Sequence, residues 1–317
     1  MEEKFSWFKK LKCFISGKLD IEELIYLLRK ESIEGFEIEF LGRQISNINF
    51  KHNLKTIKVA ILSTNATQPL ANATRIACLR ENIIAEVYES PIGAINQELI
   101  DAKSFIHSFK PDVVILDLSP NFFNISDEKP LFENDIKEKM NEDIRKIKLI
   151  WQLIDKLNAK IIQNTLICNQ YNYLGLAEEE VSWSINTYID QLNKKLTQIA
   201  SRKIIWLDIK KLSQIVGLKN WLDLRLYYQA KYGFAVRFLP LYTNWLSSCF
   251  REIYSLKPKL LILDLDNTMW GGIIGDDGLE GIKLGPETSQ GHAYEDFCKY
   301  LKSLKNRGVL LAICSKN

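Results

Sequence analysis

The chain has 317 residues and 46% of them are hydrophobic, a size and composition typical of about two globular domains. Its 42 basic and 39 acidic side chains leave a net charge of +3, which gives no support to nucleic acid as a partner. No apolar run approaches the roughly 18 residues that cross a bilayer, and the acidic start at residues 1–5 lacks the pattern of a secretory signal. These features predict a cytoplasmic protein without a membrane partner, and they leave its oligomeric state open.

Residues 1–54 are expected to form a short helical segment. The stretch from Ile21 to Arg29 has helical apolar spacing, and it follows Asp20, a residue type that commonly caps the start of a helix. This segment is expected either to pack on the domain that follows or to engage a partner.

Residues 55–256 are expected to form one α/β domain. Candidate strands lie at 57–62, 85–88, 112–118, 160–164 and 203–208, and helix-like stretches lie at 70–80, 135–157 and 183–200. Strands that alternate with helices predict a doubly wound parallel sheet. An aromatic group near the end of this domain is expected to lie in the core rather than to form a ligand shelf; it comprises Trp221, Tyr227, Tyr228, Tyr232 and Phe234.

Residues 257–317 are expected to begin a second doubly wound unit. Two short apolar runs, 260–263 and 309–314, predict buried parallel strands. The stretch 291–306 between them has helical spacing, and the glycine-dense segment 270–278 resembles a hairpin. Together they predict a strand, flap, helix, strand order in which polar groups follow both strands.

Two carboxylates, Asp264 and Asp266, follow the first of these strands, and Thr268 comes two positions later. Residues two apart in an extended segment point the same way, so the three side chains are expected to converge on one pocket if the extended geometry persists. Carboxylates this close repel each other, and a hard cation or a shared proton relieves the repulsion. Mg²⁺ is the simplest cation, and a carboxylate nucleophile beside it would favour phosphoryl transfer. The alternative is a polar turn in which Asp266 or Asn267 caps the next element.

The segment Asp264-Leu-Asp-Asn-Thr268 resembles the first motif of the haloacid dehalogenase (HAD) superfamily, and Cys314-Ser-Lys-Asn317 resembles its second. The flap from Met269 to Gly285 is similar to that of the FkbH-like branch, HAD-IIIC. The resemblance implies a Mg²⁺-dependent phosphatase in which Asp264 is the nucleophile and a metal ligand.

The same resemblance implies roles for the other motif residues. Asp266 would be the general acid and base, and its backbone carbonyl would face the metal. Thr268 would shape the loop, and Ser315 would bind the phosphoryl group.

Cys314 stands at the mouth of the expected site, whereas the other five cysteines are expected to be small buried hydrophobic residues. Proteins similar to FkbH transfer a glyceryl group from a phosphorylated three-carbon donor to an acyl carrier protein. The resemblance therefore implies a phosphorylated small-molecule substrate and a carrier-protein partner, and the Cys314 thiol is a candidate to carry the acyl group. The alternative is that Cys314 simply ends a buried strand.

The domain at 55–256 resembles the SGNH-hydrolase-like domain of FkbH-like proteins, through Ser63, Gln163-Asn164 and Asp223. A serine esterase needs a histidine base. The three histidines are His52, His107 and His292, and Leu226 stands at the position three residues after Asp223 where the family places its base. The domain is therefore expected to be a degenerate fold used for binding or docking, in which Ser63 is a cap or turn residue.

No residue follows Asn317 in which the third and fourth HAD motifs could occur. The sequence is therefore expected to be an incomplete HAD domain in which Asp264 and one carbonyl alone hold a metal weakly. The alternative function is a catalytically incomplete module that docks a carrier protein.

Overall fold

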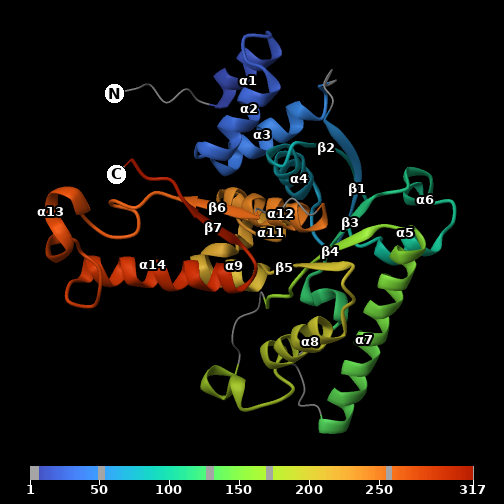
Figure 1. Ribbon diagram of the computed structural model, residues 1–317. Coiled ribbons are helices and arrows are strands. Elements are labelled where there is room, and N and C mark those ends of the chain that lie inside the picture. Colours follow the sequence, from blue (N-terminus) through green and yellow to red (C-terminus); the bar gives the residue numbers. More distant parts are fainter. Residues whose placement is uncertain (1–6, 49–53, 126–131, 169–173, 255–258, 317) are drawn as a thin grey trace. The chain divides into compact units, whose positions relative to one another are not determined.

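The computed structural model describes residues 7–48, 54–125, 132–168, 174–254 and 259–316. Two compact units divide the chain, Met1–Ser255 and Leu256–Asn317, and each is considered by itself. The course of the chain through both units can be followed in Figure 1. No helix in the described part of the chain has the length and apolar character needed to cross a membrane.

The first unit is built on a five-stranded sheet in the order β2-β1-β3-β4-β5, in which every pair of neighbouring strands is parallel. The strands are β1 (Lys55–Ser63), β2 (Ile83–Glu89), β3 (Val113–Asp117), β4 (Lys160–Asn164) and β5 (Ile204–Leu207). All five coincide with predicted strands, so the doubly wound parallel sheet expected for this region is confirmed.

Strand side chains alternate between two hydrophobic cores. In β1, Val59 and Ile61 face one core, whereas Ala60 and Leu62 face the other. The same division separates Ile115 from Leu116 in β3. Because both faces are covered, the strands read as continuous apolar runs rather than as an alternation of polar and apolar residues.

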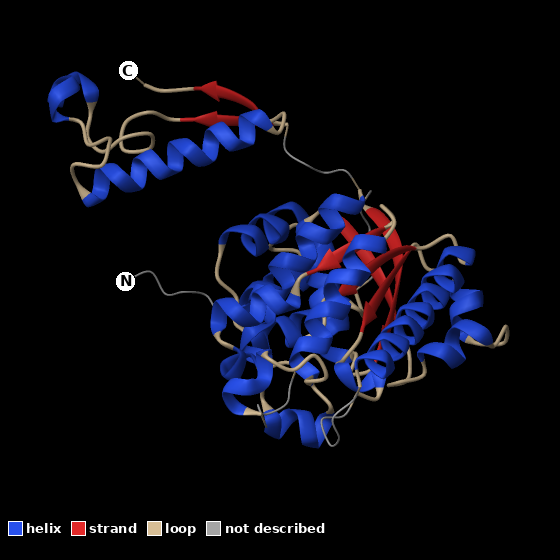
Figure 2. Ribbon diagram, turned by 90° about the horizontal axis from the view of Figure 1, so that it is seen from below, coloured by secondary structure: helices blue, strands red, loops and turns tan. Residues whose placement is uncertain are grey.

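Helices cover both faces of the sheet (Figure 2). The first core is covered by α1 (Trp7–Ile15), α2 (Ile21–Lys30), α3 (Gly35–Ile45), α4 (Gln68–Arg80), α9 (Ile209–Val216), α10 (Leu218–Trp221) and α12 (Leu239–Ile253). The second core is covered by α5 (Ile95–Ile100), α6 (Phe105–Phe109), α7 (Glu133–Lys156) and α8 (Ile185–Ile199). The remaining elements are α11 (Leu224–Ala230) and three short 3₁₀ helices, η1 (Pro120–Phe123), η2 (Gly175–Glu179) and η3 (Val236–Phe238). Helices α1 to α3 thus contribute to the core of the first unit.

Asp20 caps α2 as predicted, since its side chain accepts a hydrogen bond from the backbone of Glu23, and Glu23 in turn accepts one from the backbone of Asp20. This reciprocal pair satisfies two backbone donors at the start of the helix.

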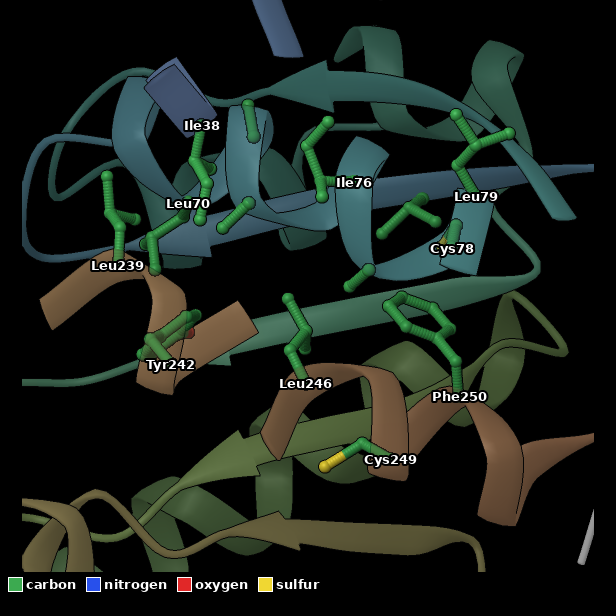
Figure 3. Packing of buried hydrophobic residues seen from close by; sticks show 14 of the residues in the cluster. Ile38, Leu70, Ile76, Cys78, Leu79, Leu239, Tyr242, Leu246, Cys249 and Phe250 are labelled. Atoms are coloured by element: carbon green, nitrogen blue, oxygen red, sulfur yellow. The ribbon is translucent and has the colours of Figure 1, made fainter. Parts of the chain in front are cut away.

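Helix α12 packs on α4 through residues at helical spacing. Figure 3 shows Leu239, Tyr242, Leu246 and Phe250 of α12 among buried side chains of α4, and all four are fully buried. Residues at this spacing form one apolar stripe along a helix. The stripe therefore fixes the C-terminal helix of this unit against the helix that follows β1.

The second unit contains two parallel strands, β6 (Leu260–Leu263) and β7 (Leu310–Ile313), and two helices, α13 (Ile274–Gly281) and α14 (Ser289–Asn306). Its element order matches the predicted strand, flap, helix, strand. The expectation that both strands are buried is wrong, because Ile262 is 60% exposed and Ile313 is 66% exposed. Among the described residues of this unit, Leu263 and Leu301 alone are buried large hydrophobic residues. A two-stranded sheet with a single long helix buries too little apolar surface to cover its strands.

Gly42 allows α3 and α4 to approach closely. A Cβ atom at this position would lie 2.6 Å from the Cα atom of Asn72 and 2.7 Å from its backbone oxygen. Backbone atoms cannot move aside as a flexible side chain does, so any side chain at Gly42 has to separate the two helices.

We expect the substitution Gly42→Ala to lower the free energy of unfolding by about 1–3 kcal/mol, the range found for overpacked cores. Urea denaturation measures this change. Arg43→Ala, an exposed change on the same helix, is the control and should alter stability by less than about 0.5 kcal/mol. Equal stability of Gly42→Ala and the wild type would contradict the close contact between α3 and α4.

Candidate functional site

The first HAD-like motif forms a tight turn directly after β6. The carbonyl oxygen of Leu265 accepts hydrogen bonds from the backbone N–H groups of Thr268, at 3.1 Å, and Met269, at 2.8 Å. Asn267 has a φ of +55°, in the left-handed region. The extended geometry that would align all three side chains therefore ends with the strand, and a turn holds the motif residues close together instead.

The Asp266 carboxylate is fixed by the flap that follows it. Its Oδ1 atom accepts hydrogen bonds from Nε1 of Trp270 and from the backbone N–H of Ile274, both at 3.1 Å. Gly271 and Lys283 close the flap as an antiparallel pair with N···O distances of 3.0 and 2.7 Å. The sequence predicted a hairpin here, and the structure adds helix α13 between the two paired residues.

The second motif follows β7 at the same edge of the small sheet. Leu263 pairs with Ile313, and the backbone N–H of Cys314 donates to the carbonyl of Leu263 at 2.9 Å. Asp264 and Cys314 thus come next on two neighbouring strands, and both are exposed. Ser315 is half-buried, and Asn317 lies outside the described residues.

The oxygen ligands that this edge offers to a metal are few. Across the described ranges, no group of three or more His, Cys, Asp or Glu side chains is placed to hold an ion. Asp264 is exposed and supplies carboxylate oxygens, the type of ligand that Mg²⁺ prefers. Mg²⁺ commonly uses one or two carboxylates and completes its shell with water and substrate phosphate, so these residues fit part of a magnesium site.

A cavity of about 530 Å³ lies beside the turn and is lined by Asn267, Thr268, Gln290, Ala293, Tyr294 and Phe297. The Tyr294 hydroxyl donates to the carbonyl of Asn267 at 3.3 Å, which ties α14 to the turn. Thr268 therefore faces the space between the motif and α14.

Ser63 belongs to a buried polar cluster rather than to a catalytic group. It is fully buried, its hydroxyl donates to Oδ2 of Asp117 at 2.6 Å, and the backbone N–H of Asn65 donates to its Oγ atom at 2.8 Å. Asn65 Nδ2 donates to the same Asp117 oxygen at 3.0 Å. Burial raises the pKa of Asp117, and the two hydrogen bonds partly oppose that rise. Such contacts are consistent with the predicted turn role of Ser63.

The other residues of the SGNH resemblance also make structural contacts. Asp223 caps α11, where its carboxylate accepts a hydrogen bond from the backbone of Leu226 at 3.1 Å. Gln163 accepts from Nε1 of Trp151 at 2.6 Å, and Asn164 bonds both backbone groups of Leu118.

Within the described first unit, His107 is not hydrogen-bonded to these residues, since its Nε2 atom is buried without a hydrogen-bond partner. His107 lies on α6, and His292 belongs to the second unit on α14. His52 lies outside the described residues. The position three residues after Asp223 is occupied by Leu226, which cannot accept a proton.

The burial of the cysteines differs in part from the prediction. Cys78, Cys168 and Cys249 are buried, whereas Cys13 and Cys298 are half-buried. The prediction that all five are buried is therefore wrong for the last two. Cys298 is oriented toward the turn, since its sulfur lies 3.7 Å from the carbonyl oxygen of Met269.

Sequence reasoning missed a second cavity, which lies in the first unit where β1 and β3 end. It has a volume of about 400 Å³ and is lined by Thr64, Ile92, Gly93, Ser119, Asn121, Phe122, Tyr227 and Lys231. The sequence did contain a sign of this cavity, because polar residues such as Thr64 and Ser119 follow the predicted strands β1 and β3. The structure shows that these two strands are neighbours. The expectation that the late aromatic group is core holds for Trp221 and Phe234, but Tyr228 is 71% exposed and Tyr227 lines this cavity.

Comparison with known proteins gives one family and several structural relatives. The model of the family described as FkbH, N-terminal domain, matches residues 58–247. No curated protein matches the chain. The N-terminal part of the protein BF1531 from Bacteroides fragilis, which contains a phosphatase domain and was crystallised with Mg, is 26% identical. Its similarity covers 90% of this chain and 74% of that one, with a TM-score of 0.77.

A weaker similarity is found to a GDSL-like lipase from Bacteroides thetaiotaomicron. It is 12% identical, with a TM-score of 0.37, over 69% of this chain and 99% of the lipase.

We expect Asp117 to make the stability of the first unit depend on pH. Its pKa is raised in the folded state, so as pH rises above about 4 the unfolded chain releases this proton more readily than the folded chain, and stability is lost. In Asp117→Asn, an amide oxygen can still accept both hydrogen bonds and carries no charge. The variant should therefore lose less stability between about pH 4 and pH 7 than the wild type, as measured by urea denaturation at several pH values.

Asp112→Asn is the matched control for this comparison, because Asp112 is an exposed carboxylate that also accepts a hydrogen bond, from the backbone of Lys58. Its pH profile should follow that of the wild type. Identical profiles for Asp117→Asn and the wild type would show that Asp117 contributes nothing to the pH dependence.

Proposed function

The chain belongs to the FkbH N-terminal domain family, and from this premise we propose that it is a Mg²⁺-dependent phosphoryl-processing protein of the FkbH type. The observation that carries the proposal is the turn after β6, which presents an exposed Asp264 while the flap orients Asp266. The similarity to the Mg-bound phosphatase-domain structure of BF1531 supports the same chemistry.

Asp264 is the proposed nucleophile. Its carboxylate oxygen would attack phosphorus and form an aspartyl-phosphate as the bond from phosphorus to the leaving oxygen breaks. Exposure leaves this carboxylate accessible to a phosphate ester.

Asp266 is the proposed general acid and base. It would protonate the leaving oxygen and then remove a proton from the water that hydrolyses the aspartyl-phosphate. The hydrogen bonds from Trp270 and Ile274 both reach Oδ1, and they hold the carboxylate group in one orientation. The flap thus acts as a support for the acid as well as a cover for the site.

The remaining motif residues would bind the phosphoryl group and shape the turn. Ser315 would donate a hydrogen bond to a phosphoryl oxygen, and Thr268 would hold the turn beside α14. Mg²⁺, held by the Asp264 carboxylate and the Asp266 carbonyl, would neutralise charge on the phosphoryl group.

The proposed substrate is a phosphorylated three-carbon acid whose acyl part passes to an acyl carrier protein. Cys314 follows β7 beside Asp264 and is exposed, which suits a residue that carries an acyl group. In a donor whose acyl carbon is bonded to a phosphate oxygen, the Cys314 sulfur would attack that carbon and form a thioester as the carbon–oxygen bond breaks and phosphate leaves. The carrier thiol would then take the acyl group and restore the Cys314 thiol, and a second, ester-linked phosphate of the donor is the group that Asp264 would remove.

A second candidate function is a module that docks a carrier protein without catalysis. The scarcity of metal ligands favours this second function, because no three His, Cys, Asp or Glu side chains of the described residues lie together where they could hold an ion. A site that lacks ligands binds Mg²⁺ weakly, since this ion keeps most of its water unless oxygen ligands replace it.

Phosphate release from p-nitrophenyl phosphate distinguishes these two functions. We expect the chain to turn over this ester with Mg²⁺, and to lose the activity by about a thousandfold or more in Asp264→Asn, because the nucleophile is gone. Asp276→Asn is the control, since Asp276 is an exposed flap carboxylate outside the motif, and it should leave the rate unchanged. Absence of turnover by well-folded protein at saturating Mg²⁺ would favour the docking module.

Mass spectrometry of the intact protein tests the acyl-carrying role of Cys314. After exposure to a labelled phosphorylated glyceryl donor, the wild type should gain the mass of one acyl group. Cys314→Ser should gain none, while Cys298→Ser, a change at a half-buried cysteine on α14, should react as the wild type does. An unchanged wild-type mass would remove the thioester step.

A further inference from the structure

The cavity where β1 and β3 end occupies the point at which the sheet order reverses. From β1 the chain crosses to β2 on one side through α4, and it then returns to β3 on the other side through α5 and α6. Doubly wound sheets bind ligands at this position, because the crossover helices leave from opposite faces and open a crevice between them. The cavity of about 400 Å³ has the size needed by a small organic molecule.

Two hydroxyl groups form the base of this cavity. Thr64 Oγ1 donates to Ser119 Oγ at 3.0 Å and accepts from the backbone N–H of Ser119 at 2.8 Å. Ser119 is only 7% exposed. Because its oxygen already accepts from Thr64, its own hydrogen is left to donate into the cavity.

A phenol group, that of Tyr227, also lines the cavity. The side-chain amide of Asn121 donates to the Tyr227 oxygen at 2.8 Å, which fixes the ring and leaves the phenolic hydrogen available to a ligand. Both residues line the cavity.

Lys231 places a positive charge at the rim. Its ammonium group lies 5.0 Å from the centre of the Tyr227 ring, and in the described part of the chain no carboxylate lies within ion-pair distance of it. Its backbone is held in place, since Lys231 ends α11 in a left-handed conformation and its carbonyl accepts from the N–H of Ala66 at 2.8 Å. The backbone of Lys231 is therefore anchored beside the loop after β1.

The rest of the wall includes apolar side chains. Ile92 and Phe122 supply apolar surface, and the ammonium group of Lys146 lies 3.8 Å from the centre of the Phe122 ring. Asp117, the buried acid described above, has a raised pKa, and its Oδ2 atom already accepts hydrogen bonds from Ser63 and Asn65.

We propose that this cavity binds a small organic anion, a carboxylate or a phosphate monoester, without hydrolysing it. The anionic group would bind the Lys231 ammonium and accept hydrogen bonds from Ser119 and Tyr227, and the carbon chain would lie against Ile92 and Phe122. No histidine of the described first unit lines the cavity, so the site lacks the base that an esterase needs. This site is built from residues of the first unit and does not depend on the proposed phosphatase activity of Asp264.

Titration of ¹⁵N-labelled full-length protein, followed by NMR, tests the proposal. The probes are inorganic phosphate and sodium glycerate, with glycerol as the neutral analogue and sodium chloride to match ionic strength. We expect saturable shifts at the amides of Thr64, Gly93 and Ser119 with at least one anion, and none with glycerol or chloride. Comparison of the two anions shows whether the site prefers phosphate or carboxylate.

Lys231→Gln should weaken the binding by about tenfold or more, the effect of losing a hydrogen bond to a charged group. Lys110→Gln is a closely matched control, since Lys110 is also an exposed lysine that ends a helix, α6, in a left-handed conformation, and it lies outside the cavity. It should bind as the wild type does. Tyr227→Phe provides an independent variant that removes one donor and keeps the ring.

Three results would overturn the proposal. The first is the absence of saturable shifts with either anion, and the second is equal shifts with chloride. The third is unchanged affinity in both Lys231→Gln and Tyr227→Phe. Asp264→Asn should bind the anion as the wild type does, so a failure of the phosphatase proposal leaves this test intact.

Discussion

Parallel strand pairing is the constraint on which both candidate sites depend. In a parallel pair the carboxyl ends of neighbouring strands meet at one edge, so residues distant in sequence become neighbours as soon as the strands pair. The pairing of β1 with β3 brings Ser63 to Asp117, and the pairing of β6 with β7 brings Asp264 to Cys314.

The polar edge of the first unit is organised by buried hydrogen bonds. Ser63, the residue that an esterase would use as nucleophile, has its hydroxyl engaged by a buried carboxylate. Leu226 occupies the position of a base, and Asp223 serves the start of α11. A buried carboxylate that accepts two hydrogen bonds organises the strand ends, while Thr64 and Ser119 line the adjacent cavity. The edge thus lines a cavity with polar groups, and no histidine of the described first unit is among the lining residues.

The sequence predicted the strands well, because each is a short apolar run bounded by polar residues. It predicted the neighbouring positions of Asp264 and Asp266, but it offered the turn that follows only as an alternative, since the left-handed backbone of Asn267 is not visible in an apolar pattern. The small helices α9 to α11 were missed because they are short and Gly217 separates the first two. The sequence did not predict a role for Lys231, because its position beside the loop after β1 results from the tertiary packing of α11.

The exposed strands of the second unit affect where the chain unfolds locally. Among the described residues of this unit, the buried large hydrophobic residues are Leu263 and Leu301. The free energy gained by burying so little apolar surface offsets only a small part of the conformational entropy lost on folding. The first unit has two extensive cores. Backbone amides of β6 and β7 should therefore exchange with solvent deuterium through local opening, whereas those of β1 and β3 should exchange only when the whole first unit unfolds. The turn that holds Asp264 and Asp266 would then belong to the unit that opens more readily.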